Sequence, residues 1–248
     1  MVLHARRTLT ITGLLALVAS CVQAQSFNFD LDFPSTPILG GGVPSSSYGA
    51  AAGQAGSWNG VLVTHIGTTP LMGLDGLPTS VNLVGPSGGI GGGHNIVGNT
   101  GDFRALMSDA RDFGRDGDVT ELLFSGLQNG RYRLFTYASS LNLYTLNTQV
   151  KVTESISSPI QTCTGPMNVN LFERGKTHTV HDLVVTNHEI HIELRELGTE
   201  HDGWLNGLQL QQVPEPASII ALLSGTFAFP RIKGKKRTSR SQAARRQR

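Results

Sequence analysis

One serine stands in a pattern typical of a nucleophile. Gly85-Pro86-Ser87-Gly88-Gly89 matches G-x-S-x-G, which in many hydrolases holds a serine on a sharp turn between a strand and a helix. A predicted strand precedes the pattern, but Ile90-Gly91-Gly92-Gly93 follows it where a helix is needed. The sequence therefore favours a glycine-rich loop over a catalytic Ser87. The loop also has no G-x-G-x-x-G that opens a helix, so it predicts no nucleotide site.

Histidines gather in the C-terminal half of the chain, at His178, His181, His188, His191 and His201. Side chains alternate along a strand, so His191 and Glu193 share a face and could form a His/carboxylate metal site. His188-Glu189-Ile190-His191 is not the zinc motif H-E-x-x-H, because its second histidine comes one residue early. Solvent-facing polar positions on strands are the favoured interpretation.

Acidic residues cluster around two glycines, at Asp112, Asp116, Asp118 and Glu121. An EF-hand that begins at Asp112 needs a glutamate at its twelfth position, where Leu123 stands. A looser calcium site that stabilises this loop is one candidate, and a solvated acidic turn is the other. We expect no cofactor, with calcium as the ion that this loop could hold.

Aromatic side chains could stack on a sugar ring, since they combine an apolar face with a polar group. The candidates are Tyr48, Trp58, Tyr144 and Trp204. Trp58 and Trp204 fall in predicted strands, which favours core packing. Tyr48 and Tyr144 lie nearer to loops and are the better surface candidates.

Short strands must position these residues, because the pattern contains almost no helix. Phe27, Phe29, Leu31 and Phe33 alternate with polar residues and predict a half-buried strand. The other predicted strands are Trp58–His65, Ser80–Val84, Val119–Ser125, Arg131–Ala138, Leu146–Thr153, Thr177–Val185, Glu189–Leu197 and Trp204–Gln211. Asn129-Gly130 predicts a hairpin between two of these strands, and Asp102–Phe113 predicts the one short helix. We expect an all-β fold, an antiparallel jelly-roll-type β-sandwich.

The N-terminus has the three parts of a secretory signal peptide. Arg6-Arg7 is followed by apolar Leu9–Ser20 and then by Val22-Gln23-Ala24, a small-residue cleavage site. Cleavage between Ala24 and Gln25 would remove residues 1–24. Two alternatives stay open: Val18-Ala19-Ser20-Cys21 resembles a lipobox with Cys21 as the lipidated residue, and Arg6-Arg7 could belong to a twin-arginine signal.

The C-terminal residues 213–248 also have three parts in order. Val213-Pro214-Glu215-Pro216 favours extended chain outside a folded domain. Ala217–Phe229 is apolar but shorter than the about 20 residues that cross a bilayer. The remaining residues to Arg248 are rich in Lys and Arg without an acid, and such ends stay cytoplasmic. The order predicts a precursor held transiently at the inner membrane, with the folded domain at residues 25–212.

This tail resembles the PEP-CTERM sorting signal of Gram-negative bacteria. The resemblance implies recognition by an exosortase, which is a membrane protease or transpeptidase, and cleavage near Pro214-Glu215-Pro216. It also implies release at the cell surface, often together with exopolysaccharide and biofilm production. The chain departs from the pattern in its short apolar run and in Pro230, which interrupts the end of that run.

Two segments of the body resemble galactose-binding-like and malectin-like jelly-roll domains. They are Phe124–Leu134 and Trp204–Leu210. The resemblance implies the sandwich fold, and it raises extracellular polysaccharide as a partner without assigning a sugar site, since this fold hosts many functions.

Charge excludes one class of partner. Residues 25–212 contain 9 Lys and Arg against 17 Asp and Glu, a net charge near −8, so the basic character belongs to the tail. An acidic body repels nucleic-acid phosphates, and we expect no nucleic-acid binding. Cys163 is the one cysteine of this body, which excludes an internal disulfide.

The sequence leads to three hypotheses of function. The first is an exported, non-catalytic cell-envelope or extracellular-matrix protein that is sorted by its tail. The second is a carbohydrate-binding module for exopolysaccharide. The third is a secreted hydrolase, for which no pair of carboxylates stands out in the strand pattern.

Overall fold

The structure is a computed structural model that describes residues 24–33, 42–88, 90–93, 98–112, 119–139, 147–197 and 203–214. The chain divides into two units, Met1–Val213 and Pro214–Arg248, and only Pro214 of the second is described. The apolar and basic parts of the tail, most of the predicted signal peptide, Tyr144, Asp116 and Asp118 lie outside the described residues.

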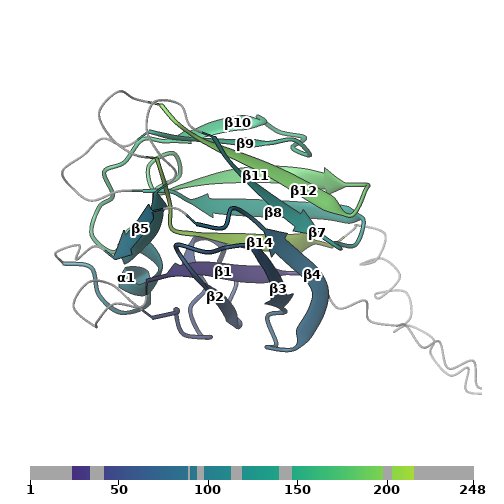
Figure 1. The fold of residues 1–248 in the computed structure, drawn as a ribbon, viewed down its shortest axis with the longest axis horizontal. Coiled ribbons are helices and arrows are strands. Elements are labelled where there is room, and N and C mark those ends of the chain that lie inside the picture. The colour runs from purple at the N-terminus through teal and green to yellow at the C-terminus, as the bar shows by residue number, and fades with distance from the viewer. Residues whose placement is uncertain are drawn as a thin grey trace, which may run out of the picture. The chain divides into compact units, whose positions relative to one another are not determined.

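Two large sheets form the body (Figure 1). The five-stranded sheet has the order β11 (His178–Val185), β8 (Gly130–Tyr137), β14 (Gly207–Val213), β1 (Phe27–Asp32) and β2 (Trp58–Leu62). The six-stranded sheet has the order β10 (Ile160–Cys163), β9 (Thr148–Val152), β12 (Glu189–Glu196), β7 (Val119–Ser125), β4 (Pro78–Val84) and β3 (Thr68–Met72). A small third sheet joins β13 (Trp204–Leu205), β6 (Asp109–Asp112) and β5 (Ile90–Gly93), and α1 spans Gly101–Ser108.

The main core lies between the two large sheets. Alternate residues of each strand point into it, among them Phe29 of β1, Leu134 of β8, Phe124 of β7 and Ile192 of β12, all at most 1% exposed. The antiparallel β-sandwich predicted from the alternation is confirmed. One pair departs from it, because β1 and β2 run parallel.

A second buried layer covers the outer face of the five-stranded sheet. Trp58, Phe103, Phe135, Tyr137 and Met167 form its apolar cluster, which draws on strands, α1 and the segment 164–177. The 3₁₀ turn η1 (Ala50–Ala52) packs against it. Because of this cover, β1 is buried on both faces, and the expectation of a half-buried strand is wrong.

Side-chain amides close both open sides of the sandwich. At one side Asn59 of β2 accepts a hydrogen bond from the Met72 backbone N–H (2.7 Å) and donates one to its carbonyl (3.0 Å). At the other side Gln161 of β10 does the same with Val180 of β11, donating at 2.5 Å and accepting at 3.2 Å. In each case the edge strand of one sheet is joined to the edge strand of the other. The bonded backbone groups are therefore not open to pairing with another chain.

Three local expectations need correction. The strands flanking Asn129-Gly130 do not form a hairpin, because β7 pairs with β4 and β12 while β8 pairs with β11 and β14. The connection crosses between sheets and buries Leu127, whose N–H bonds the His188 carbonyl at 3.0 Å. The predicted helix ends at Ser108, because β6 begins at Asp109 and pairs with β5. The sequence also missed the strands β3, β5 and β10.

The described residues contain no helix with the length and apolar character of a membrane span.

Candidate functional site

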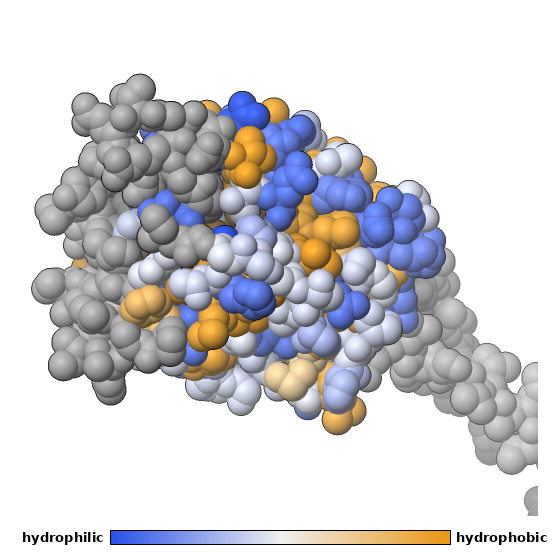
Figure 2. Space-filling view, in the orientation of Figure 1, coloured by the Kyte–Doolittle hydropathy of each residue, from blue (hydrophilic) through white to orange (hydrophobic). Residues whose placement is uncertain are grey.

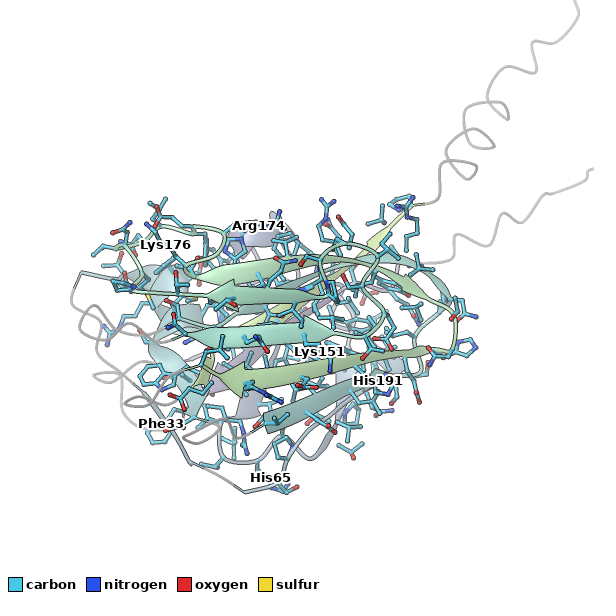
Figure 3. All side chains as sticks on the ribbon, turned by 90° about the horizontal axis from the view of Figure 1, so that it is seen from above. Phe33, His65, Lys151, Arg174, Lys176 and His191 are labelled. Atoms are coloured by element: carbon cyan, nitrogen blue, oxygen red, sulfur yellow. The ribbon has the colours of Figure 1, made fainter. Side chains whose placement is uncertain are left out.

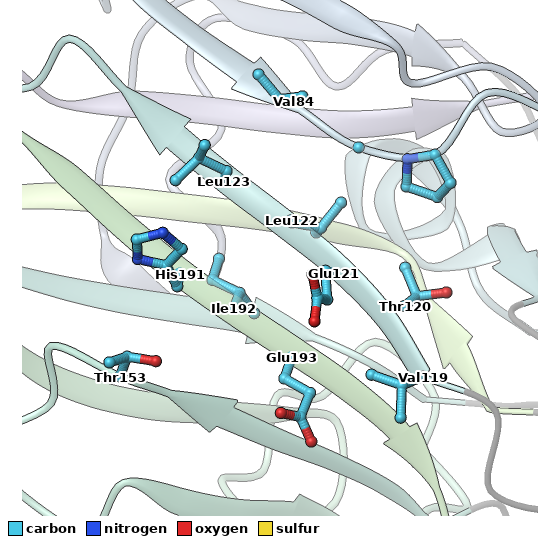
Figure 4. Close-up of a pocket in the computed structure, with 12 residues that line it drawn as sticks. Val84, Val119, Thr120, Glu121, Leu122, Leu123, Thr153, His191, Ile192 and Glu193 are labelled. Carbon is cyan, nitrogen blue, oxygen red and sulfur yellow. The ribbon is translucent and has the colours of Figure 1, made fainter.

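A groove of about 840 Å³ lies on the outer face of the six-stranded sheet (Figure 4). Residues of β7 and β12 line it, and Val84, Gly85 and Pro86 border it where β4 ends. The face seen in Figure 2 mixes hydrophilic and hydrophobic residues, with an orange area bordered by blue in the region of β7. This groove is the candidate site.

Two carboxylates stand side by side in the groove. Glu121 of β7 and Glu193 of β12 are directly opposite in the antiparallel register. Lys151 of β9 is the next residue in the same row, and its Nζ lies 2.8 Å from Glu193 Oε2. Glu121 has no ion pair or hydrogen bond within the described part of the chain. Arg195 Nη2 also lies 3.5 Å from Glu193 Oε1. Like charges at directly opposed positions destabilise a sheet, so Glu121 does not stabilise the sheet at this position.

A histidine at the edge of the groove is held by acids. His191 Nδ1 lies 2.9 Å from Glu154 Oε1, and its backbone N–H donates to Glu154 Oε2 at 2.8 Å. His191 Nε2 lies 3.7 Å from Glu189 Oε2. Figure 3 shows His191 and Lys151 on neighbouring strands of the same sheet. The glutamates fix the orientation of the ring beside the groove.

Apolar side chains supply the rest of the lining. Val84, Pro86, Val119 and Leu123 belong to it, and Val119 is 42% exposed. A groove with carboxylates and a histidine on an apolar floor offers hydrogen-bond acceptors beside a surface for C–H groups. A sugar presents both kinds of group, hydroxyls at its rim and C–H bonds on its ring faces.

The three predicted sugar-stacking residues that the structure describes, Tyr48, Trp58 and Trp204, do not line this groove. Trp58 is buried, its Nε1 donates to the Tyr48 carbonyl at 3.2 Å, and the two rings stack with centroids 6.3 Å apart. Tyr48 is half-buried beside Phe172, so burial and the nearby Asp102 raise the pKa of its phenol above the usual value. Trp204 is half-buried in β13, where it pairs with Asp112 of β6.

The two described acids of the predicted calcium site lie in different sheets. Asp112 lies in β6 of the small sheet, whereas Glu121 lies in the groove on β7. Among the described residues, no group of three or more His, Cys, Asp or Glu is arranged to hold a metal ion.

The serine of the G-x-S-x-G pattern, Ser87, lies beside a histidine. Ser87 and His65 form an isolated β-bridge, and both are exposed. A methyl group added at Gly67 would lie 3.1 Å from His65 Nε2 and 3.6 Å from Ser87 Oγ, so both atoms border the same small space. No hydrogen bond joins His65 Nε2 to Ser87 Oγ in the described structure. The strand β5 follows where a nucleophile elbow has its helix.

Two of the clustered histidines are buried, which corrects the expectation of solvent-facing positions. His178 is 6% exposed and His181 is 0% exposed. Burial, together with the nearby Arg174, lowers the pKa of each imidazole to about 4. His188 and His191 are exposed as expected, and His201 lies outside the described residues.

Sequence reasoning missed the carboxylate pair of the groove. Glu121 had been grouped with the aspartates before it, and Glu193 with His191. Alternation places each glutamate on the outer face of its own strand. The signal that was lacking is the register, since only the pairing of β7 with β12 sets the two residues opposite each other.

Comparisons with known proteins identify no family. No family model matches the chain, and no curated protein matches it. Among solved structures, it resembles the YxiM protein of Bacillus subtilis at 14% identity and a TM-score of 0.38, over 76% of this chain and 40% of that one. It resembles a β-glucuronidase of Bacteroides uniformis at 11% identity and a TM-score of 0.38, over 64% and 20% of the two chains.

A smaller protein gives a similar result. A family 35 carbohydrate-binding module of Clostridium thermocellum matches at 13% identity and a TM-score of 0.30, over 54% of this chain and 91% of the module. TM-scores of this size assign neither a family nor an activity. The chain spans less than half the length of YxiM and of the glucuronidase.

Proposed function

We propose that this is an exported, non-catalytic cell-envelope or matrix protein whose β-sandwich binds a polysaccharide in the groove of the six-stranded sheet. The observation that carries the proposal is the opposed pair Glu121 and Glu193 on an apolar floor. Each carboxylate can accept hydrogen bonds from two sugar hydroxyls, and Leu123 and Val84 can contact a ring face. The negative charge favours neutral or amino sugars over uronic acids, because an acidic polymer would be repelled.

Neutralising either groove carboxylate should weaken glycan binding. Hydrogen bonds to charged groups contribute about 1.5–3 kcal/mol, so Glu121→Gln or Glu193→Gln should each raise the Kd about tenfold or more. The measurement is a glycan array with neutral, amino-sugar and acidic polysaccharides, followed by titration calorimetry on the best ligand. Glu173→Gln is the matched control, since Glu173 pairs with Lys176 outside the groove. Binding to no polysaccharide, or binding that both variants retain, would contradict this site.

The same pair supports glycoside hydrolysis as a second candidate. Glycosidases use two carboxyl groups that flank the bond to be cleaved. Incubating the polysaccharides found on the array with the protein and measuring reducing ends separates the two functions. Binding without new reducing ends supports the module, whereas release that Glu121→Gln and Glu193→Gln both abolish supports an enzyme.

Export makes its own prediction for the tail. The mature surface protein should end near Pro214–Pro216 and lack Arg231–Arg248, because an apolar run beside a basic end holds the precursor at the membrane. Basic residues near an anionic surface contribute about 1 kcal/mol each to that attraction. Intact-mass spectrometry of protein from the native host gives the mass of the mature chain and thereby its N-terminal and C-terminal residues. Changing Pro214-Glu215-Pro216 to alanines should leave uncut precursor in the membrane fraction, and a surface form that still carries Arg248 would rule out sorting by cleavage.

A further inference from the structure

One side of the sandwich is a seam between the edge strands β10 and β11. Besides the Gln161 amide, Arg174 Nη2 donates to the Val180 carbonyl (3.2 Å) and to Gln161 Oε1 (3.3 Å). Farther along, Ile156 N–H bonds the Asp182 carbonyl at 2.9 Å, and Val184 N–H bonds the Glu154 carbonyl at 3.2 Å. Bonds of Asp182 with the hydroxyls of Ser155 and Ser157, at 3.4 Å each, add to these links between β11 and the neighbouring sheet. Figure 3 shows Arg174 at the opposite sheet edge from His65.

The two buried histidines lie on opposite faces of β11 within this seam. His178 faces outward, with the rings of Phe135, Tyr137 and Phe172 about it at centroid distances of 5.8–6.1 Å, and its Nδ1 is 3.1 Å from Thr177 Oγ1. His181 faces the core. Neither of its ring nitrogens has a well-formed hydrogen bond in the described structure. The backbone groups of Pro159 and Val150 raise the pKa of the ring, but burial outweighs them. Both rings are therefore in places that do not accept a charge.

The charged groups around the seam do not compensate a histidinium ion. Arg174, which lowers the pKa of both rings, is itself a cation. Each acid near the seam already has a partner: Glu173 pairs with Lys176, Asp182 with Arg133, and Glu154 with His191.

The other titratable groups packed here stay neutral in acid. Burial raises the pKa of the Cys163 thiol to about 12, and it raises the pKa of the Tyr137 phenol as well. Protonation would thus place three positive charges in one seam without an added negative charge.

We propose that the seam between β10 and β11 is an acid-sensitive element, which opens locally when His178 and His181 become protonated. Opening frees both rings to bind protons as they do in water, and it separates them from Arg174. It also uncovers the aromatic layer that contains Tyr137 and breaks the amide closure at this side of the sandwich. The element belongs to the fold, and this proposal does not rest on the glycan site.

The direction of the pH effect follows from the lowered pKa values. Each imidazole has a pKa of about 4 in the closed state and 6.5 in the open state. Above pH 6.5 the rings are neutral in both states, and the closed state has its full stability. As the pH falls toward 4, only the open state binds the protons, and the closed state loses that stability. Two such groups give opening coupled to two protons, so the opening constant should rise about 100-fold per pH unit within this window.

Hydrogen exchange with mass spectrometry on the full chain measures this coupling. After correction for intrinsic exchange, the amides of Ile156, Val180 and Val184 should lose protection with the two-proton slope between pH 6.5 and 4, while amides of β1 and β14 keep theirs. His178→Phe suits the aromatic layer, His181→Leu suits the core, and each should reduce the slope to about tenfold per pH unit. If either variant fails to fold, the other still shows whether the histidine that it replaces contributes a proton to the opening.

Three outcomes would overturn the proposal. One is seam protection that does not change with pH in the native protein. Another is a loss of protection with the same slope in the native protein and in both variants, which would assign the effect to other groups. The third is loss of protection in all strands together, which would show global acid unfolding instead of a local opening.

Discussion

Replacing Asp30 with asparagine is expected to stabilise the protein at neutral pH. Asp30 is 0% exposed, and neither of its carboxyl oxygens has a hydrogen-bond partner in the described structure. Burial, followed by the charges of Asp109 and Asp32, raises the pKa of this carboxyl well above its usual value. Asparagine leaves a buried polar group in place but cannot ionise, so it removes the added cost of a carboxyl that the unfolded chain ionises at pH 7. We expect Asp30→Asn to raise the unfolding free energy by about 1–3 kcal/mol at pH 7.

The effect should depend on pH in a direction that the raised pKa fixes. Below the unfolded-state pKa of 3.8 the acid is neutral whether the chain is folded or not, so the variant gains little there. As the pH rises, the unfolded state releases the proton first, and the native protein loses stability that the asparagine variant keeps. Urea unfolding of both proteins at pH 4 and pH 7 measures the difference. Asp182→Asn is the control, because the Asp182 side chain is 43% exposed, pairs with Arg133 and is not among the charges that act on Asp30. An equal gain at both pH values, or no gain at pH 7, would contradict a buried acid at this position.

Periodicity predicted the sandwich because the main core obeys it. Phe27, Phe29 and Leu31 alternate as a strand requires, and all three lie in the core between the sheets. The intervening Asn28 and Asp30 are polar and were therefore expected to face water. They are fully buried because residues 42–57, α1 and β6 cover that face. The part of this cover at residues 42–57 is rich in glycine, alanine and serine, and it has no periodic pattern by which the sequence would reveal it.

The candidate site was less predictable than the fold, because it depends on register. Glu121 and Glu193 are separated by more than seventy positions in the sequence, and each fits an ordinary exposed strand position. The hairpin predicted at Asn129-Gly130 would have paired β7 with β8, whereas the groove requires β7 beside β12. Turn chemistry describes the chain locally and does not decide which sheet the next strand joins. The role of Trp58 was hidden for a related reason, since this side chain packs in the second buried layer, which the sequence does not reveal.

That buried layer depends on one amide, and replacing Gln209 with leucine should destabilise the protein strongly. Gln209 is 0% exposed on β14, and its Nε2 donates to Asn28 Oδ1 (2.8 Å) and to the Gly49 carbonyl (3.2 Å). Its Oε1 accepts hydrogen bonds from the Tyr137 hydroxyl and from the Ala52 N–H. Leucine has nearly the same volume but leaves these buried groups without that partner, each at about 1–3 kcal/mol.

We therefore expect Gln209→Leu to lower the unfolding free energy by about 3 kcal/mol or more, which is large among single substitutions. Gln211→Leu is the matched control, because Gln211 lies one alternation farther on the same face of β14, is only half-buried, and makes no side-chain hydrogen bond in the described structure. Chemical denaturation gives the difference in stability. The fluorescence of Trp58, which stacks on Tyr48, reports whether the covering layer loosens before the sheets separate. Equal stability of the two leucine variants would show that the amide network does not hold the layer in place, and that its apolar contacts alone are sufficient.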